Sequence, residues 1–248
     1  MPLELSVATP DGAARAWLHR APGEAPAPGV VFLPDAFGVR PALHEMAARL
    51  ASLGYAVLLP DVYHREGAVP PFDIATTWTT PSERARVMAL IATLDAGRVG
   101  RDFGAWLDAL DAQPGVLPGG AGAVGYCMGG RHAFLAAALH PERVKAAAAF
   151  HAGWIVKDGD DSPHLLAARV RAAVYLGAAD DDRSCTPEHQ GTLASALAKA
   201  GVRYALELYA GKKHGFAVPD NAGAYDPAAA ARHWRRLEAF FAEHLRAA

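Results

Sequence analysis

The chain has 248 residues, a formal net charge of −2 at pH 7, 52% hydrophobic residues and 20% charged residues. These values are typical of a packed globular protein. No basic block stands out, so we expect neither nucleic acid nor an anionic membrane as a partner. No apolar run reaches the length of about 18 residues that a bilayer span requires. Residues 1–12 carry no charged segment followed by an apolar one, so we expect no signal peptide and a cytoplasmic location.

Predicted strands and helices alternate along the chain. Strands are predicted at residues 3–7, 14–19, 30–34, 55–60, 122–126, 144–153, 172–178 and 203–209, and helices at 41–54, 82–94, 101–113, 128–139, 187–201 and 227–245. Short continuous apolar runs are typical of strands that are covered on both faces, and the alternation predicts a mostly parallel sheet with helices on both faces. We find no repeat or linker, so we expect a single α/β domain over residues 1–248.

The stretch Gly125-Tyr126-Cys127-Met128-Gly129 lies between a predicted strand and a predicted helix. This pattern matches the G-x-S-x-G nucleophile elbow, with sulfur in place of oxygen. The helix N-terminus there favours a thiolate and offers N–H groups to a developing oxyanion. The alternative is a buried cysteine that fills space as a small apolar side chain.

Hydrolases with this elbow place the nucleophile, the acid and the histidine in that order along the chain. Asp180 follows the apolar run 172–178, and His214 follows the last predicted strand. Asp181 and Asp182 adjoin Asp180, so the position of the acid is open by one or two residues. Each residue also has a structural interpretation, as a cap or a loop side chain, but three placements in the right order indicate a catalytic triad.

The chain resembles the dienelactone hydrolases, or carboxymethylenebutenolidases, which have the α/β-hydrolase fold. Five segments carry the resemblance: GYCMGG at 125–130, HGF at 214–216, PDVYHR at 60–65, PDAFGVR at 34–40 and DSPH at 161–164. The resemblance implies Cys127 as nucleophile, His214 as base and Asp180 as the residue that orients it. It also implies an oxyanion hole formed by the N–H groups of Ala36 and Met128.

The resemblance implies further roles near the thiol. Asp35 matches a family glutamate that holds the resting thiol and helps to activate it, and the alternative for Asp35 is the capping of a turn. Arg86 matches one of two family arginines that bind a substrate carboxylate, whereas Val218 stands where the second would be. The loss of one charge-assisted contact, worth roughly 1.5–3 kcal/mol, favours a neutral or differently shaped substrate.

Other residues near the predicted site are aromatic or histidine side chains. Tyr63 and His151 are candidate substrate-binding residues, and Trp78 and Trp154 are candidate walls of the pocket, with a packing role as the alternative for each. No H-E-x-x-H, C-x-x-C or phosphate-loop motif is present, so we expect no metal, no nucleotide and no cofactor. Cys185, in a polar stretch, is expected to be an inert thiol.

The sequence therefore predicts cysteine-dependent hydrolysis of a small ester or lactone through a thioester. One alternative is a general carboxylesterase with neutral substrates, and another is a non-catalytic ligand or redox sensor on a hydrolase fold. We expect a small-molecule partner and a monomer or weak homodimer. The natural substrate and any lid motion of residues 61–81 are not predicted.

Overall fold

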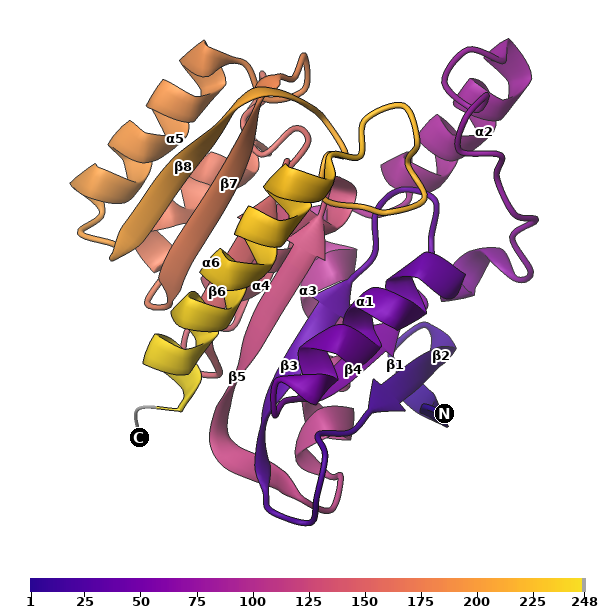
Figure 1. The fold of residues 1–248 in the computed structure, drawn as a ribbon, viewed down its shortest axis with the longest axis vertical. Coiled ribbons are helices and arrows are strands. Elements are labelled where there is room, and N and C mark those ends of the chain that lie inside the picture. The colour runs from indigo at the N-terminus through magenta and orange to yellow at the C-terminus, as the bar shows by residue number, and fades with distance from the viewer. Residues whose placement is uncertain (247–248) are drawn as a thin grey trace.

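One sheet of eight strands runs through the computed structural model, which describes residues 1–246 (Figure 1). The strands are β1 (Leu3–Thr9), β2 (Gly12–His19), β3 (Ala27–Leu33), β4 (Ala56–Pro60), β5 (Val116–Tyr126), β6 (Val144–Phe150), β7 (Ala173–Asp181) and β8 (Tyr204–Lys213), in the order β1-β2-β4-β3-β5-β6-β7-β8. The hairpin β1–β2 and its contact with β4 are antiparallel, and the pairs from β4 to β8 are parallel. This confirms the predicted mostly parallel sheet.

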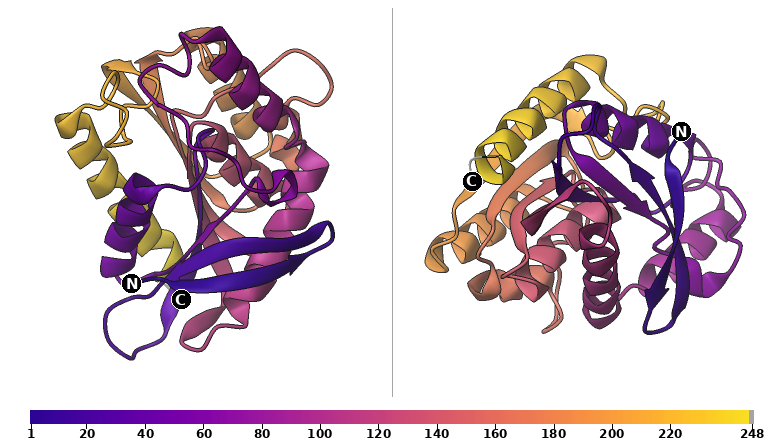
Figure 2. Two further views of the ribbon diagram at one scale, coloured as in Figure 1. Left: turned by 90° about the vertical axis from the view of Figure 1, so that its right-hand side faces the viewer. Right: turned by 90° about the horizontal axis from the view of Figure 1, so that it is seen from below.

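Helices cover both faces of the sheet (Figure 2). They are α1 (Pro41–Ser52), α2 (Pro81–Ala92), α3 (Ala96–Asp111), α4 (Met128–Leu139), α5 (Pro187–Lys199) and α6 (Pro227–Leu245), with short 3₁₀ turns η1 (His64–Glu66) and η2 (Pro163–Arg169). Four of them start with proline, whose fixed φ and missing N–H suit the first helical position. One hydrophobic cluster lies under α1 and α6, and the other lies under α2 to α5.

Several strands extend beyond the apolar runs that predict them, and β7 and β8 do so at their carboxyl ends, next to the site. β7 continues to Asp181 and β8 to Lys213, and these two residues pair after an irregularity in the register. Backbone hydrogen bonds continue the ladder there, although the side chains have become polar and exposed. The end of β7 therefore lies three residues later than hydrophobicity predicts, which decides the position of the acid described below.

Parallel strands end at one edge of the sheet, and the loops that follow β3, β5, β6, β7 and β8 meet there. Open α/β sheets bind ligands at this edge. No helix within residues 1–246 is long and apolar enough to cross a membrane.

Candidate active site

Cys127 occupies a strained turn between β5 and α4. Its φ of 55° and ψ of −119° lie in a region that L-residues rarely adopt. A Cβ atom on Gly125 would lie 2.0 Å from the carbonyl oxygen of Gly129, so only glycine fits at that position. The predicted strand–turn–helix arrangement of a nucleophile elbow is therefore present in the backbone.

The loop after β3 packs directly against the start of α4. A Cβ atom on Gly129 would lie 2.4 Å from the carbonyl oxygens of both Leu33 and Pro34. This contact brings the segment that holds Ala36 beside the elbow. Within residues 1–246, the N–H groups of Ala36 and Met128 donate to no other protein group. The two N–H groups predicted for an oxyanion hole are thus available.

His214 is held by a buried carboxylate. Its Nδ1 lies 2.7 Å from Oδ2 of Asp182, whose side chain is almost completely buried. The hydroxyl and the backbone N–H of Ser184 donate to the other oxygen of Asp182 at 2.7 and 2.8 Å. The Ser184 hydroxyl also lies 3.3 Å from Nδ1 of His214. Sequence reasoning did not identify Ser184, because a serine beside three aspartates has no distinguishing pattern.

The acid that contacts His214 is Asp182, so the prediction of Asp180 is wrong. Asp180 instead accepts a hydrogen bond from the N–H of Gly211 at 2.8 Å. Asp180 and Asp181 still belong to strand β7, so the first residue free to turn toward the histidine loop is Asp182. The prediction had left this position open by two residues, and its error comes from placing the strand end too early.

Neighbouring charges control the protonation of His214. Burial disfavours the charged imidazole, but the negative charge of ionised Cys127 and the contact with Asp182 outweigh it and raise the pKa of His214 to about 10. Burial also opposes the charge on Asp182, yet His214 and Ser184 lower the pKa of this carboxyl below its ordinary value. At neutral pH the arrangement therefore favours a protonated His214 beside an ionised Asp182.

His151 contacts the backbone of the elbow. Its Nδ1 accepts a hydrogen bond from the N–H of Cys127 at 3.2 Å, and its ring lies edge-on to that of His214 with the centroids 5.1 Å apart. It is 1% exposed, and burial keeps its pKa far below the ordinary value. The structure therefore places His151 against the backbone of Cys127 and buries it, which corrects its prediction as a substrate-binding residue.

Comparisons with known proteins identify the family of the chain. The model of the dienelactone hydrolase family matches residues 15–245. The chain belongs to the dienelactone hydrolase family. A carboxymethylenebutenolidase from Rhodococcus opacus is 30% identical over 238 residues, which cover 92% of this chain and 86% of that protein.

Solved structures of the family superpose over the whole chain. A protein from Klebsiella pneumoniae, assigned as a dienelactone hydrolase, has a TM-score of 0.85 at 23% identity, covering 98% of this chain and 99% of that one. A dienelactone hydrolase-like promiscuous phosphotriesterase from metagenomic libraries has a TM-score of 0.80 at 27% identity, covering 98% of each chain. The α/β-hydrolase fold predicted from the sequence is thus confirmed.

Asp35 has a different partner in this dienelactone hydrolase family member from the one that the resemblance implies. Both of its oxygens accept hydrogen bonds from Arg40, at 2.7 and 2.8 Å, and Oδ1 also accepts from the N–H of Phe37. Arg40 extends this pair to Asp220. Within the described chain the Asp35 carboxylate makes no hydrogen bond to Cys127. The predicted contact with the resting thiol is therefore replaced by an ion pair.

Arg86 is also occupied within the protein. Its guanidinium bonds Glu83 and the carbonyl oxygen of Pro70, and it stacks over the ring of Phe72 at 3.7 Å. These contacts tie α2 to the loop before it, so the structure does not present Arg86 as a free carboxylate-binding group. Val218, at the other family arginine position, is 1% exposed.

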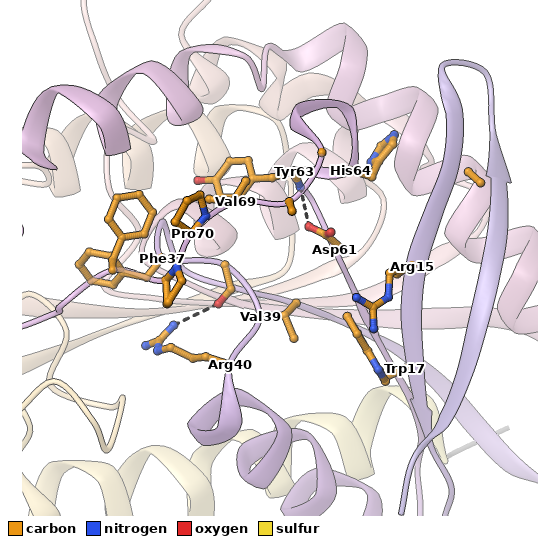
Figure 3. Close-up of a pocket in the computed structure, with 16 residues that line it drawn as sticks. Arg15, Trp17, Phe37, Val39, Arg40, Asp61, Tyr63, His64, Val69 and Pro70 are labelled. Atoms are coloured by element: carbon orange, nitrogen blue, oxygen red, sulfur yellow. Dashed lines mark hydrogen bonds between the residues drawn. The ribbon is translucent and has the colours of Figure 1, made fainter.

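Tyr63 lies between the loop that holds Ala36 and a neighbouring pocket. Its hydroxyl donates to the carbonyl oxygen of Ala36 at 3.0 Å and lies 3.4 Å from the sulfur of Met128. Its ring lines a pocket of about 560 Å³, together with Phe37 and Arg40 (Figure 3). Neither Cys127 nor His214 lines that pocket. Tyr63 therefore contacts the loop that holds Ala36 from the side facing away from these two residues.

The second cysteine does not have the surroundings of a nucleophile. Cys185 is buried and unpaired, and burial together with nearby Asp182 raises the pKa of its thiol to about 12. Among residues 1–246 no three His, Cys, Asp or Glu side chains gather closely enough to bind a metal ion. Cys127 is therefore the thiol with the surroundings of a nucleophile.

Proposed function

We propose that the protein hydrolyses small esters or lactones through a thioester on Cys127. The observation that carries this proposal is the His214–Asp182 pair beside a cysteine on a strained elbow. The family membership supports a hydrolase, and the curated relative from Rhodococcus opacus supports an ester or lactone as the substrate class.

In the first half of the reaction, the sulfur of Cys127 attacks the substrate carbonyl as a thiolate. A carbon–sulfur bond forms, and the carbonyl electrons move to the oxygen, where the N–H groups of Ala36 and Met128 stabilise the negative charge. Loss of one such donor typically lowers the rate about 10²–10³-fold. The carbon–oxygen bond then breaks, and the imidazolium of His214 gives its proton to the departing alkoxide or enolate.

In the second half, neutral His214 accepts a proton from water. The resulting hydroxide attacks the thioester, the carbon–sulfur bond breaks, and the sulfur leaves as a thiolate beside the imidazolium. Asp182 keeps the imidazole in the tautomer and orientation that both halves need. A good leaving group such as an enolate suits this chemistry, because a tetrahedral adduct with a poorer one expels the sulfur again.

The test compares wild type with Cys127→Ala on a neutral aryl ester and on a carboxylated dienelactone. We expect Cys127→Ala to lower kcat/KM at least about 10³-fold, and we expect rapid quenching of wild type to trap the acyl group on the Cys127 peptide. Cys185→Ala is the matched control, and its turnover should stay within about threefold of wild type. Turnover by folded Cys127→Ala at the wild-type rate would refute the proposal.

A further inference from the structure

Ser184 follows the end of β7, and both of its hydrogen-bond donors point to one oxygen of Asp182. The hydroxyl and the backbone N–H donate to Oδ1 of Asp182 at 2.7 and 2.8 Å. The other oxygen, Oδ2, lies 2.7 Å from Nδ1 of His214. The last torsion of an aspartate side chain is broad, so a carboxylate without such donors can turn about it. Ser184 thus fixes the plane in which the carboxylate meets the histidine.

The hydroxyl of Ser184 also faces His214 itself. Its Oγ lies 3.3 Å from Nδ1 of His214. A serine hydroxyl has one proton and two lone pairs. Because Ser184 gives its proton to Asp182, a lone pair of Oγ is left for the N–H at Nδ1. The Nδ1 proton therefore has Oδ2 of Asp182 as its near acceptor and Oγ of Ser184 as its far one, and Nε2 is left to exchange protons during the reaction.

The loop after β6 holds Ser184 from another side. β6 and β7 are neighbours in the sheet (Figure 1). The N–H of Trp154 donates to the carbonyl oxygen of Ser184 at 3.0 Å, and a Cβ atom on Gly153 would lie 3.2 Å from Oγ of Ser184. Trp154 has a φ of 53°, a left-handed conformation that persists only where the surrounding structure holds it. The hydroxyl is thus confined between Gly153, Asp182 and His214.

We propose that Ser184 is a positioning residue of the reaction, whose hydroxyl holds Asp182 in the orientation that keeps the Nδ1 proton of His214 in place. In the described part of the chain no hydrogen bond joins Ser184 to Cys127, so it acts through the carboxylate. This inference rests on the proposed function for the reaction that the residue serves. The contacts among Ser184, Asp182 and His214 do not involve the substrate, which allows a test without turnover.

The first test is the kinetics of Ser184→Ala on the neutral aryl ester. We expect kcat to fall about 10-fold, the usual effect of losing one buried hydrogen bond to a charged group, and KM to stay within about twofold. Ser184→Thr keeps the hydroxyl and should restore kcat to within about threefold of wild type. A kcat of folded Ser184→Ala equal to that of wild type overturns the proposal, and so does a Ser184→Thr protein as slow as Ser184→Ala.

Ser162→Ala is the matched control for these variants. The Ser162 hydroxyl is also buried and also has two contacts, because it accepts from the N–H of Lys157 at 2.9 Å and lies 2.7 Å from Nδ1 of His164. It contacts none of Cys127, Asp182 and His214 by a hydrogen bond. We expect Ser162→Ala to keep kcat within about threefold of wild type, even where it lowers the free energy of unfolding.

A second test asks whether Ser184 acts through Asp182. In the Asp182→Asn background the carboxylate is gone, so Ser184→Ala should change kcat by less than about twofold, against about 10-fold in the wild-type background. Residues in one hydrogen-bond network show such non-additive effects. The same 10-fold loss in both backgrounds would mean that Ser184 acts by another route, and would overturn the proposal.

A third test does not depend on turnover. The contact with Asp182 raises the pKa of His214, so Ser184→Ala in a Cys127→Ala background should lower that pKa, and Ser162→Ala should leave it unchanged. NMR of the histidine ring signals against pH measures it, and neighbouring His151 stays neutral because burial keeps its pKa far below the ordinary value. If wild type hydrolyses no ester, the proposed function fails, and an unchanged pKa of His214 in this titration then overturns the role of Ser184.

Discussion

The elbow around Cys127 and the segment 61–80 between β4 and α2 lie on two sides of the site, but different forces hold them. Backbone atoms in contact define the elbow, where Gly125 and Gly129 leave no room for a Cβ atom. Side chains hold the segment, through Arg86 on the carbonyl of Pro70 and a group of aromatic rings around Phe72. Changes at the elbow should therefore have large effects on catalysis, and changes at the segment should have graded ones.

The largest expected effect distinguishes two aspartates near the end of β7. Asp182→Asn should lower kcat about 10³–10⁴-fold, because an amide favours the wrong tautomer of His214. Asp180→Asn should change kcat by less than about threefold, because its carboxylate accepts a backbone N–H away from the histidine. Steady-state kinetics of both variants decides the matter. Equal losses in the two would mean that the whole end of β7, and not one carboxylate, supports the histidine.

A second prediction concerns the steric limit at the elbow. Gly129→Ala should lower the free energy of unfolding by about 3 kcal/mol, because its Cβ would overlap two carbonyl oxygens. It should also lower kcat about 10²-fold by displacing the oxyanion donors. Gly191→Ala, at an exposed position of α5 with open space around it, should raise the free energy of unfolding by about 0.5–1 kcal/mol. Urea unfolding measures both, and a Gly129→Ala protein as stable as wild type would contradict the steric argument.

A third prediction follows from the charges around His214. Because ionised Cys127 helps to raise the pKa of His214 to about 10, Cys127→Ala should lower that pKa toward the ordinary histidine value. At pH 8.5 the imidazole should then be charged in wild type and largely neutral in the variant. Histidine ring signals followed by NMR against pH test this, with Cys185→Ala as the control. The same pKa in Cys127→Ala and wild type would show that Asp182 alone holds the proton.

The smallest effect is expected at the segment itself. Arg86→Met should lower the free energy of unfolding by about 1 kcal/mol, through loss of the stacking on Phe72 and of partly exposed hydrogen bonds. Turnover of acidic and neutral esters should fall together and by only a few fold. Thermal unfolding and kinetics on both esters measure these effects. A selective loss on the acidic ester would instead support the carboxylate-binding role that the resemblance implies for Arg86.

Local patterns in the sequence predicted the fold and the elbow well. A strand, a glycine-flanked cysteine and a helix follow one another within a short stretch, so the sequence of residues 122–139 is enough to indicate the turn between them. The acid was missed by two residues because β7 continues through polar residues, held by its pairing with β8. Apolar side chains stop at the boundary of the core, whereas a strand continues for as long as its backbone forms hydrogen bonds with the neighbouring strand.

The roles of several charged residues depended on partners distant in sequence. Asp35 pairs with Arg40, which also binds Asp220, and no local pattern shows that third residue. Burial likewise distinguishes Arg131 of α4, which is 8% exposed, from Arg86 of α2, which pairs with Glu83, although the two arginines look alike in sequence. Sequence motifs locate the groups that react, whereas the environment of each charge is set by the three-dimensional packing.

The close contact of Gly129 with Leu33 and Pro34 has a consequence for the identity of the nucleophile. The contact fixes the turn through the main chain, so the frame depends little on which atom the residue at position 127 carries. A serine at position 127 would have the same backbone and the same neighbours as Cys127. It would differ from the cysteine mainly in acidity and in the stability of the acyl group that it forms. The reacting atom at position 127 could therefore be exchanged while the backbone of the turn stays the same.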